Sequence, residues 1–261
     1  MDTQDTQLVR AHDQLLFTIK RRMKRTGGLL IEGDGFVVYD MGISEADTHM
    51  RGACLDADGN VSALLDTMER TFDSDPRDEW TIRVHPCALN NTRSQIESAG
   101  YRCRDEKGAP IMVVTQPIER HTVFQTELVP LDTQGEQLLK EASPVLEDAF
   151  ELSKKTSCHL LLGGGWTTDP YCRAAVIRQD RPVCFGMLTM APNAKTAGIY
   201  YIATLSSCRG QGLAKDLVTD LTNEAFRLGA REVILQASEL GKFVYDRLGY
   251  QEIGRYYSFR R

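Results

Sequence analysis

One stretch, residues 199–214, constrains the fold more than any other part of the chain. It begins with Ile199–Leu205, an apolar and aromatic run with the length and residue types of a buried strand. After it, Leu213, Leu217 and Leu221 recur at a spacing of four, which predicts the apolar face of an amphipathic helix. The stretch between them contains two glycines. The sequence therefore predicts a strand, a glycine-containing turn and a helix in direct succession.

The predicted turn has the chemistry of a phosphate site. The first N–H groups of a helix have no partners inside the helix, and the helix dipole is positive there. Gly210 and Gly212 let the backbone approach a phosphate without a Cβ in the way, and Arg209 adds a positive charge. The Gly-Lys-Ser/Thr of a P-loop is missing, and the Rossmann glycine pattern fits poorly. We call residues 209–214 the cradle and predict that it binds a diphosphate.

The cradle sequence, Arg209-Gly-Gln-Gly-Leu-Ala214, resembles the Arg/Gln-x-x-Gly-x-Gly/Ala signature of the GNAT superfamily of N-acetyltransferases. A second segment, Ser238 to Tyr250, resembles the closing segment of that family. There, an Asn or Ser is followed seven residues later by Tyr and then by Leu-Gly-Phe/Tyr. In this chain Tyr245 and Leu248-Gly-Tyr250 match the pattern. The resemblance covers the second half of the chain.

The resemblance implies acetyl-coenzyme A as co-substrate. It places the acetyl-pantetheine arm in a gap between splayed strands, here 199–205 and 232–236, where it pairs with backbone groups. It makes Tyr245 the general acid, whose ordinary pKa of about 10 suits protonation of a leaving thiolate. Ser238 would bind the pantetheine arm or a water molecule, or else simply cap a helix. The implied cofactor-binding residues are Ala203, Thr204, Leu205, Arg209, Gly210, Gln211, Gly212, Leu213, Ala214, Ser238 and Tyr245.

The general base is not identified by the sequence. Many members of the family have a Glu on the strand before the cradle, but residues 199–205 contain no acid. Glu239 and Asp169 are candidates, a water molecule is another, and no base is needed if the amine arrives neutral. Cys208 beside the cradle has no evident His or Asp partner nearby, which argues against an acyl-enzyme.

The first half of the chain has a similar order of predicted elements. We predict a helix over 7–25, a hairpin of strands 29–31 and 36–39, and a helix over 61–72. Strand 81–84, a helix over 88–99, Ala-Gly-Tyr101 and strand 111–115 then mirror strand 232–236, a helix, Leu-Gly-Tyr250 and strand 253–258. This is a weak internal repeat, typical of two copies of one α+β unit.

The first copy lacks the cradle. The turn before its second helix contains Asp56 and Asp58 and no Arg, and carboxylates repel phosphate. The resemblance therefore extends to tandem GNAT proteins whose first copy is degenerate. We expect an α+β fold of two GNAT-like units, each a mixed antiparallel and parallel sheet flanked by helices. The predicted domains are 1–118, degenerate, and 119–261, catalytic, with 116–122 as a linker.

The second half supplies further elements. Strand 123–129, a helix over 134–152 and a loop over 160–170 precede a hairpin of strands 172–178 and 183–190. The three glycines in the loop are not followed by a helix, so we expect a flexible loop beside the active site.

Composition excludes several classes of protein. The chain has 261 residues, 31 Lys and Arg against 36 Asp and Glu, and a net charge of −5. No basic block is present, so we expect no nucleic-acid partner. No apolar run approaches the ~18 residues of a transmembrane helix, and the acidic N-terminus does not resemble a signal peptide. Seven cysteines without a C-x-x-C pair argue against disulfides or zinc, so we expect no metal and a cytoplasmic location.

These observations favour an N-acetyltransferase that transfers the acetyl group of acetyl-CoA to a primary amine by direct attack in a ternary complex. Two alternatives remain open: a non-catalytic coenzyme A sensor or scaffold, and an acyltransferase that uses another acyl-CoA. The acceptor is a small amine, a peptide N-terminus or a lysine, and the sequence does not select among them. The oligomeric state is not indicated either.

Overall fold

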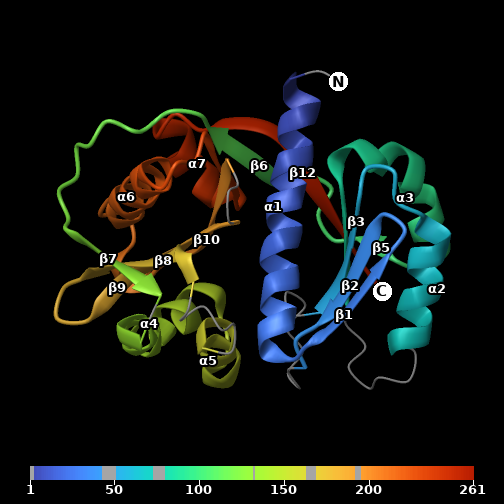
Figure 1. Cartoon of the computed structure of the whole chain (residues 1–261), viewed down its shortest axis with the longest axis horizontal. Coiled ribbons are helices and arrows are strands. Elements are labelled where there is room, and N and C mark those ends of the chain that lie inside the picture. The colour runs from blue at the N-terminus through green and yellow to red at the C-terminus, as the bar shows by residue number, and fades with distance from the viewer. Residues whose placement is uncertain (1–2, 43–50, 73–79, 132, 163–168, 192–194) are drawn as a thin grey trace. The chain divides into compact units, whose positions relative to one another are not determined.

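The computed structural model describes the whole chain except residues 1–2, 43–50, 73–79, 132, 163–168 and 192–194 (Figure 1). The chain divides into two compact units. Unit 1 contains residues 1–111 and 253–261, and unit 2 contains residues 112–252. Unit 2 is thus one continuous segment, whereas unit 1 is assembled from both ends of the chain.

Unit 1 is a mixed sheet with helices. Strands β1, β2 and β3 form an antiparallel meander, β4 pairs with β3 in parallel, and β12 pairs antiparallel with β4 and with the short β5. The strands are β1 (Leu29–Gly33), β2 (Phe36–Asp40), β3 (Arg51–Leu55), β4 (Thr81–Val84), β5 (Arg102–Cys103) and β12 (Gln251–Arg260). The helices are α1 (Thr3–Thr26), α2 (Val61–Phe72) and α3 (Leu89–Ser98).

The C-terminal strand completes the core of unit 1. Apolar residues of α2 such as Leu64 and Phe72 pack with strand residues and with Phe259 of β12, whose side chain is fully buried. The register pairs Tyr257 with Val84 and Arg260 with Thr81. The sequence prediction assigned 253–261 to the second domain, whereas the structure places this strand in unit 1, because its hydrogen bonds and its buried phenylalanine are both there.

Unit 2 is also a mixed sheet. Strands β7 to β10 are antiparallel in sequence order, and β11 pairs in parallel with β10. Helix α6 lies on one face of this sheet with α7 beside it, and α4 and α5 cover the other face (Figure 1). The strands are β7 (Thr126–Leu131), β8 (Asp169–Arg178), β9 (Pro182–Met190), β10 (Thr196–Thr204) and β11 (Glu232–Gln236). The helices are α4 (Thr133–Phe150), α5 (Lys154–Leu162), α6 (Leu213–Arg227) and α7 (Glu239–Arg247).

The division between the units falls within strand β6 (Ala109–Val114). Met112 and Val114 at its end are buried in the core of unit 2. Strands β6 and β12 each follow one of the two matching Gly-Tyr segments. The end of β6 joins unit 2, and β12 from residue 253 joins unit 1, so each strand crosses to the other unit. A sequence repeat shows that both strands exist but does not show which sheet each one joins.

The expected mixed sheet with flanking helices is confirmed, and several boundaries agree to the residue. Helix α2, strand β4 and strand β11 match the predicted ranges. Helix α5 was missed, and its residues 160–162 were assigned to a loop. The apolar residues of α5 gather at its C-terminal end instead of recurring with helical spacing, so its sequence lacks the usual signal. The rest of the predicted glycine loop, 163–168, lies outside the described residues.

The predicted linker is held against helix α6. The carboxylate of Asp216 accepts the backbone N–H of Val123 at 2.8 Å, and its side chain is 1% exposed. Asn223 exchanges two hydrogen bonds with the backbone of Ile118, at 2.8 and 2.9 Å. Because the two α6 residues are seven apart, they share one face of the helix. The segment 116–122 is therefore fixed in unit 2 by side chains of α6.

Candidate active site

Strand β10 separates from β11 along its second half. Their parallel pairing joins Thr196–Gly198 to Glu232–Ile234. Beyond Gly198, β10 continues to pair with β9, through a bulge between Tyr200 and Ala203. Tyr201 in this bulge has φ of 58°, a left-handed conformation that is uncommon for a tyrosine. Residues 199–204 are therefore not paired with β11, in the place where the resemblance implies splayed strands, and we call this unpaired region the gap.

Fewer residues direct their backbone groups toward this gap than the sequence suggested. Leu205 donates its N–H to the carbonyl of Val183 on β9, at 2.9 Å. Alternate residues of a strand direct their backbone groups to opposite neighbours, so Ala203 also faces β9 and Thr204 faces the gap. That Ala203, Thr204 and Leu205 bind the pantetheine stays a prediction, and the pairing with β9 favours Thr204 among the three. The N–H of Leu205 is already used, and Thr204 alone of the three presents its backbone to the gap.

The cradle contains amides that precede the first hydrogen bond of helix α6, and its two glycines border open space. Gly210 and Gly212 have φ of 79° and 88°, and a methyl group on either would meet no atom within 4 Å. Gly212 is the N-cap of α6 and provides no side-chain cap. The first helical hydrogen bond joins the N–H of Asp216 to the carbonyl of Gly212, so the amides of 213–215 precede it. The amides expected at the start of α6 are therefore not used by the helix itself, and their binding of a diphosphate stays a prediction.

A carboxylate from another helix positions the segment that leads into the cradle. Asp148 on α4 accepts the N–H of Ser206 at 2.5 Å and its Oγ–H at 3.0 Å. These hydrogen bonds, together with the charge of Arg209, hold the pKa of Asp148 below its usual value. The Arg209 Nε donates to the carbonyl of Thr204 at 3.3 Å, across the end of β10. Asp148 is 58 residues away from Ser206 in the chain, and no sequence pattern connects the two.

Tyr245 on α7 is a buried phenol near the same end of β10. Its side chain is 7% exposed, and burial, with a smaller effect from Cys184, raises its pKa well above the ordinary value. The Cys184 thiol lies 3.2 Å from the hydroxyl of Thr204, and burial raises its pKa to about 11. Tyr245 therefore keeps its proton at neutral pH, as a proton donor must.

Ser238 is the N-cap of helix α7. Its Oγ accepts the N–H of Gly241 at 3.0 Å, and its side chain is exposed. The cap that the sequence offered as an alternative is therefore present. Of the two candidate bases, Glu239 is exposed in the first turn of α7, whereas the side chain of Asp169 lies outside the described part.

Among the described residues, no group of three or more His, Cys, Asp or Glu side chains is arranged to hold a metal ion. In the same part of the chain, no helix has the length and apolar character needed to cross a membrane.

Residues 137–250 match the sequence model of the Acetyltransferase (GNAT) family. This range runs from α4 to the residue before β12 and contains every predicted site residue. The segment is therefore similar to GNAT acetyltransferase domains, and the match supports an acyltransferase enzyme. A comparison with curated proteins gives no match.

Solved structures resemble the chain over nearly its full length. A GCN5-related N-acetyltransferase from Kribbella flavida is 18% identical, with a TM-score of 0.68 over 97% of this chain and 94% of that one. A GCN5-related N-acetyltransferase from Sphaerobacter thermophilus is 15% identical, with a TM-score of 0.61 over 95% and 91%. A GCN5-related N-acetyltransferase-like protein from Streptococcus suis is 16% identical, with a TM-score of 0.55 over 98% and 98%. At these identities the likeness shows the fold alone.

Proposed function

We propose that the protein is an N-acetyltransferase that transfers the acetyl group of acetyl-CoA to a primary amine in a ternary complex. One observation carries this proposal: the open amide cradle at 209–214 directly follows the strand that borders the gap. A diphosphate on the cradle directs the pantetheine arm into the gap, where the backbone of Thr204 faces it. Arg209, with a fixed positive charge, supports the same diphosphate.

The chemistry assigns two tasks to the chain. The amine nitrogen attacks the thioester carbonyl, whose developing negative charge needs a donor, and the N–H of Thr204 faces the gap. A donor of this kind is worth about 3 kcal/mol in other acyl-transfer sites. As the carbon–sulfur bond breaks, Tyr245 gives its proton to the thiolate, and the attacking nitrogen loses a proton to water or to a base. The tyrosine recovers its proton from solvent.

We further propose that unit 1 is a degenerate copy of the catalytic unit and binds no coenzyme. Three observations support this proposal. The order β1-β2-β3-α2-β4-α3 repeats as β8-β9-β10-α6-β11-α7. Both series contain an antiparallel meander followed by a parallel strand. The turn of unit 1 contains Asp56 and Asp58 where unit 2 has Arg209.

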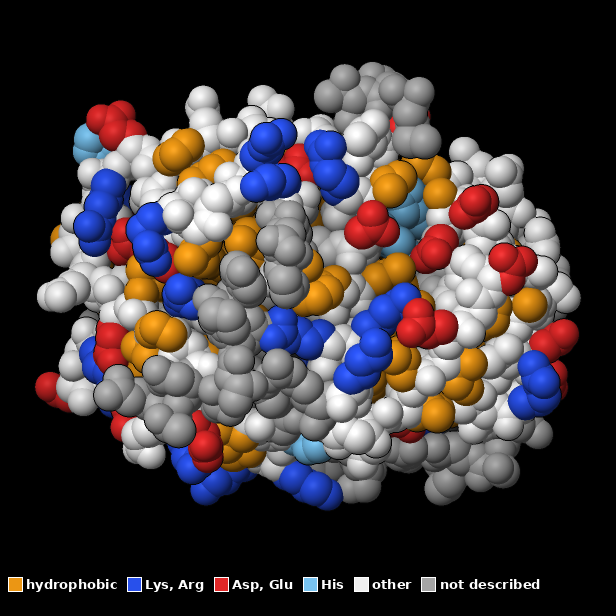
Figure 2. Space-filling view, in the orientation of Figure 1, with side chains coloured by type: hydrophobic (Ala, Val, Ile, Leu, Met, Phe, Trp, Pro, Cys, Tyr) orange, Lys and Arg blue, Asp and Glu red, His pale blue; other side chains and the backbone are white. Residues whose placement is uncertain are grey.

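The charge of the surface does not select the acceptor. Basic side chains form several separate groups, interspersed with acidic ones, on the face in Figure 2. A net charge of −5 over 261 residues is too small to favour a cationic amine. Small amines, peptide N-termini and lysines therefore all belong in a substrate screen, and so do acyl groups other than acetyl.

We propose a cytoplasmic location. All seven cysteines are free, and Cys54, Cys172 and Cys184 are buried as small core residues. Reduced thiols of this kind are typical of a reducing compartment.

A screen of amines tests the function against the sensor alternative. Full-length protein is incubated with acetyl-CoA, and separately with succinyl-CoA, together with polyamines, amino sugars, and peptides with a free N-terminus or lysine. Free thiol release and acylated product are then measured, and calorimetry measures coenzyme A binding in parallel. Product from at least one amine supports an acyltransferase. Coenzyme binding without thiol release for every amine class would favour the sensor.

A further inference from the structure

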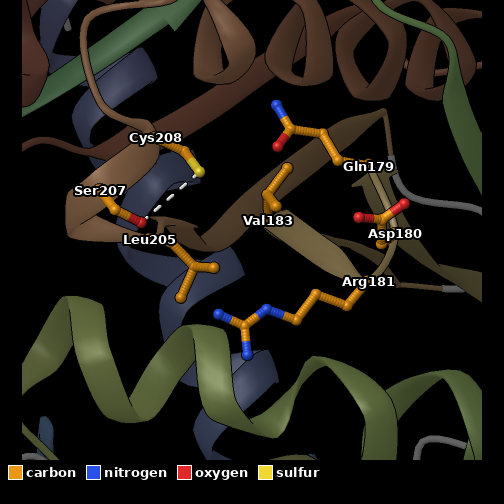
Figure 3. A pocket seen from close by; sticks show the side chains of 7 residues that line it. All are labelled: Gln179, Asp180, Arg181, Val183, Leu205, Ser207 and Cys208. Atoms are coloured by element: carbon orange, nitrogen blue, oxygen red, sulfur yellow. Dashed lines mark hydrogen bonds between the residues drawn. The ribbon is translucent and has the colours of Figure 1, made fainter.

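A pocket lies beside the cradle in unit 2. Its volume is about 280 Å³, and it is bounded by the β8–β9 turn (residues 179–181) and by the segment that leads into the cradle. Figure 3 shows Arg181 and Leu205 on one side, Gln179 and Cys208 on the other, and Val183 between them. We call it the side pocket. Its lining residues are Gln179, Asp180, Arg181, Val183, Leu205, Ser207 and Cys208.

The side pocket and the gap lie on opposite sides of strand β10. The gap is on the β11 side, because β10 loses its pairing with β11 after Gly198. The pocket is on the β9 side, because Val183 belongs to β9 and Leu205 is hydrogen-bonded to it. The cradle follows the end of β10 between them. If a diphosphate binds at the cradle with its pantetheine ester in the gap, its nucleoside ester extends away from the gap. The side pocket lies next to the cradle on that other side of β10.

The lining suits a nucleobase. Val183 and Leu205 are 3% and 9% exposed and form an apolar floor for the flat face of a ring. The side chains of Gln179 and Asp180 are exposed at the rim and offer groups that can bind an exocyclic amine. Ligand pockets for whole drug-sized molecules measure about 300–1,000 Å³, so this pocket has room for a base and part of its sugar.

Arg181 supplies a cation that has no side-chain partner among the described residues. Within the described part of the chain, its side chain is engaged in no hydrogen bond or ion pair. Arg178, three residues earlier, instead pairs with Glu127 at 2.9 Å and Glu141 at 2.8 Å. A free guanidinium is a good partner for a phosphate group, which it can bind with two parallel hydrogen bonds.

We propose that the side pocket binds the adenosine end of the coenzyme and that Arg181 binds its 3′-phosphate. This inference rests on the proposed function of the cradle. It makes the β8–β9 turn a determinant of which coenzyme the enzyme selects. Loss of the 3′-phosphate from the ligand and loss of Arg181 from the protein then remove the same interaction.

The test is a double-variant cycle between ligand and protein. Coenzyme A and 3′-dephospho-coenzyme A are titrated into the full-length protein and into Arg181→Ala. We expect the parent to prefer coenzyme A by about tenfold, the size of one charge-assisted contact at an exposed site. We expect Arg181→Ala to bind both ligands equally, at the affinity of the parent for the dephospho form. Arg178→Ala is the matched control, and it should keep the preference of the parent.

Adenosine 3′,5′-bisphosphate provides a second measurement, because it contains the nucleotide end without pantetheine. It should bind the parent and bind Arg181→Gln about tenfold more weakly, since the amide keeps length but loses the charge. If Arg181→Ala binds coenzyme A tightly and still prefers it to 3′-dephospho-coenzyme A, the side-pocket assignment is wrong, whereas the proposed binding of the diphosphate at the cradle is unaffected. If neither ligand binds the parent, the proposed function fails as well, so the two failures are distinguishable.

Discussion

The turns before α2 and α6 follow the same pattern of strand, turn and helix, yet they differ in what their amides do. In unit 1 the N–H of Asp56 is donated to the carbonyl of Gly35 at 2.9 Å, and that of Asn60 to Asp34 at 3.0 Å. The side chain of Asn60 also accepts the N–H of Ala63 at 3.0 Å and so caps α2. In unit 2 the equivalent cap is a glycine. A helix N-terminus can therefore bind an anion only where the chain has not already used its donors.

The parallel strand pairs β3–β4 and β10–β11 also differ between the units, in how far along the strands the pairing extends. Strands β3 and β4 stay paired from Gly52–Thr81 to Leu55–Val84, which is the end of both strands. Strands β10 and β11 are joined only at their first three residues. Unit 1 therefore has no gap that matches the one in unit 2. In unit 1 the strands stay paired to their ends and Asn60 occupies one amide of the helix N-terminus, so unit 1 differs from unit 2 at both features that we propose for coenzyme binding.

The largest expected effect tests how the units are assembled. Phe259→Ala removes a fully buried ring from the core of unit 1 and should lower the free energy of unfolding of that unit by about 3–5 kcal/mol. Coenzyme A affinity should change by less than about twofold, because the cradle belongs to unit 2. Chemical denaturation with calorimetry on the same samples measures both.

Phe243→Ala is the control for this substitution. Phe243 is a phenylalanine of α7 that is 68% exposed, so its loss should cost less than about 0.5 kcal/mol. A Phe259→Ala variant that keeps full stability, or that loses coenzyme binding, would contradict the assignment of β12 to unit 1.

A pair of charge reversals compares the two turns directly. Arg209→Glu places a carboxylate beside the proposed diphosphate and should weaken coenzyme A binding by about 100-fold or more. Asp58→Lys makes the opposite change at an exposed position in the turn of unit 1 and should alter the affinity by less than about twofold. Circular dichroism confirms that both variants fold. Equal coenzyme A affinity in the two variants would contradict the proposal that the cradle binds the diphosphate.

The proton donor is tested by Tyr245→Phe. The substitution removes only the hydroxyl, so kcat should fall about 10- to 100-fold while coenzyme affinity stays within about twofold. Because burial raises the pKa of Tyr245, the parent rate should not decline as pH rises through the range where a free tyrosine ionises. An intact kcat in the variant would mean that another group protonates the thiolate.

The smallest expected effects come from one substitution made at two glycines. Gly212→Ala adds a methyl group in open space and in a left-handed conformation that costs about 1–2 kcal/mol, and it should weaken coenzyme binding about tenfold. Gly59→Ala places its methyl 2.1 Å from the carbonyl oxygen of Gly35. It should destabilise unit 1 by about 1–3 kcal/mol and leave binding unchanged. The reverse pattern would mean that the two turns have been assigned the wrong roles.

Local patterns in the sequence predicted much of this fold. The spacing of Leu213, Leu217 and Leu221 and the glycines before them indicated α6 and its open N-terminus, because both depend on neighbouring residues. The bulge at Tyr201 was not predictable, because a strand pattern does not encode a register shift against its neighbour. The contact of Asp148 with Ser206 and the pairing of β12 with β4 join residues far apart in the chain. No local periodicity carries such information.

A crystal structure of the full-length protein with coenzyme A tests the central claim most directly. We predict that the diphosphate lies on the amides of residues 210–214 in unit 2, with the pantetheine arm between β10 and β11. A coenzyme bound at the 56–60 turn of unit 1, or crystals that contain none at saturating concentration, would contradict it.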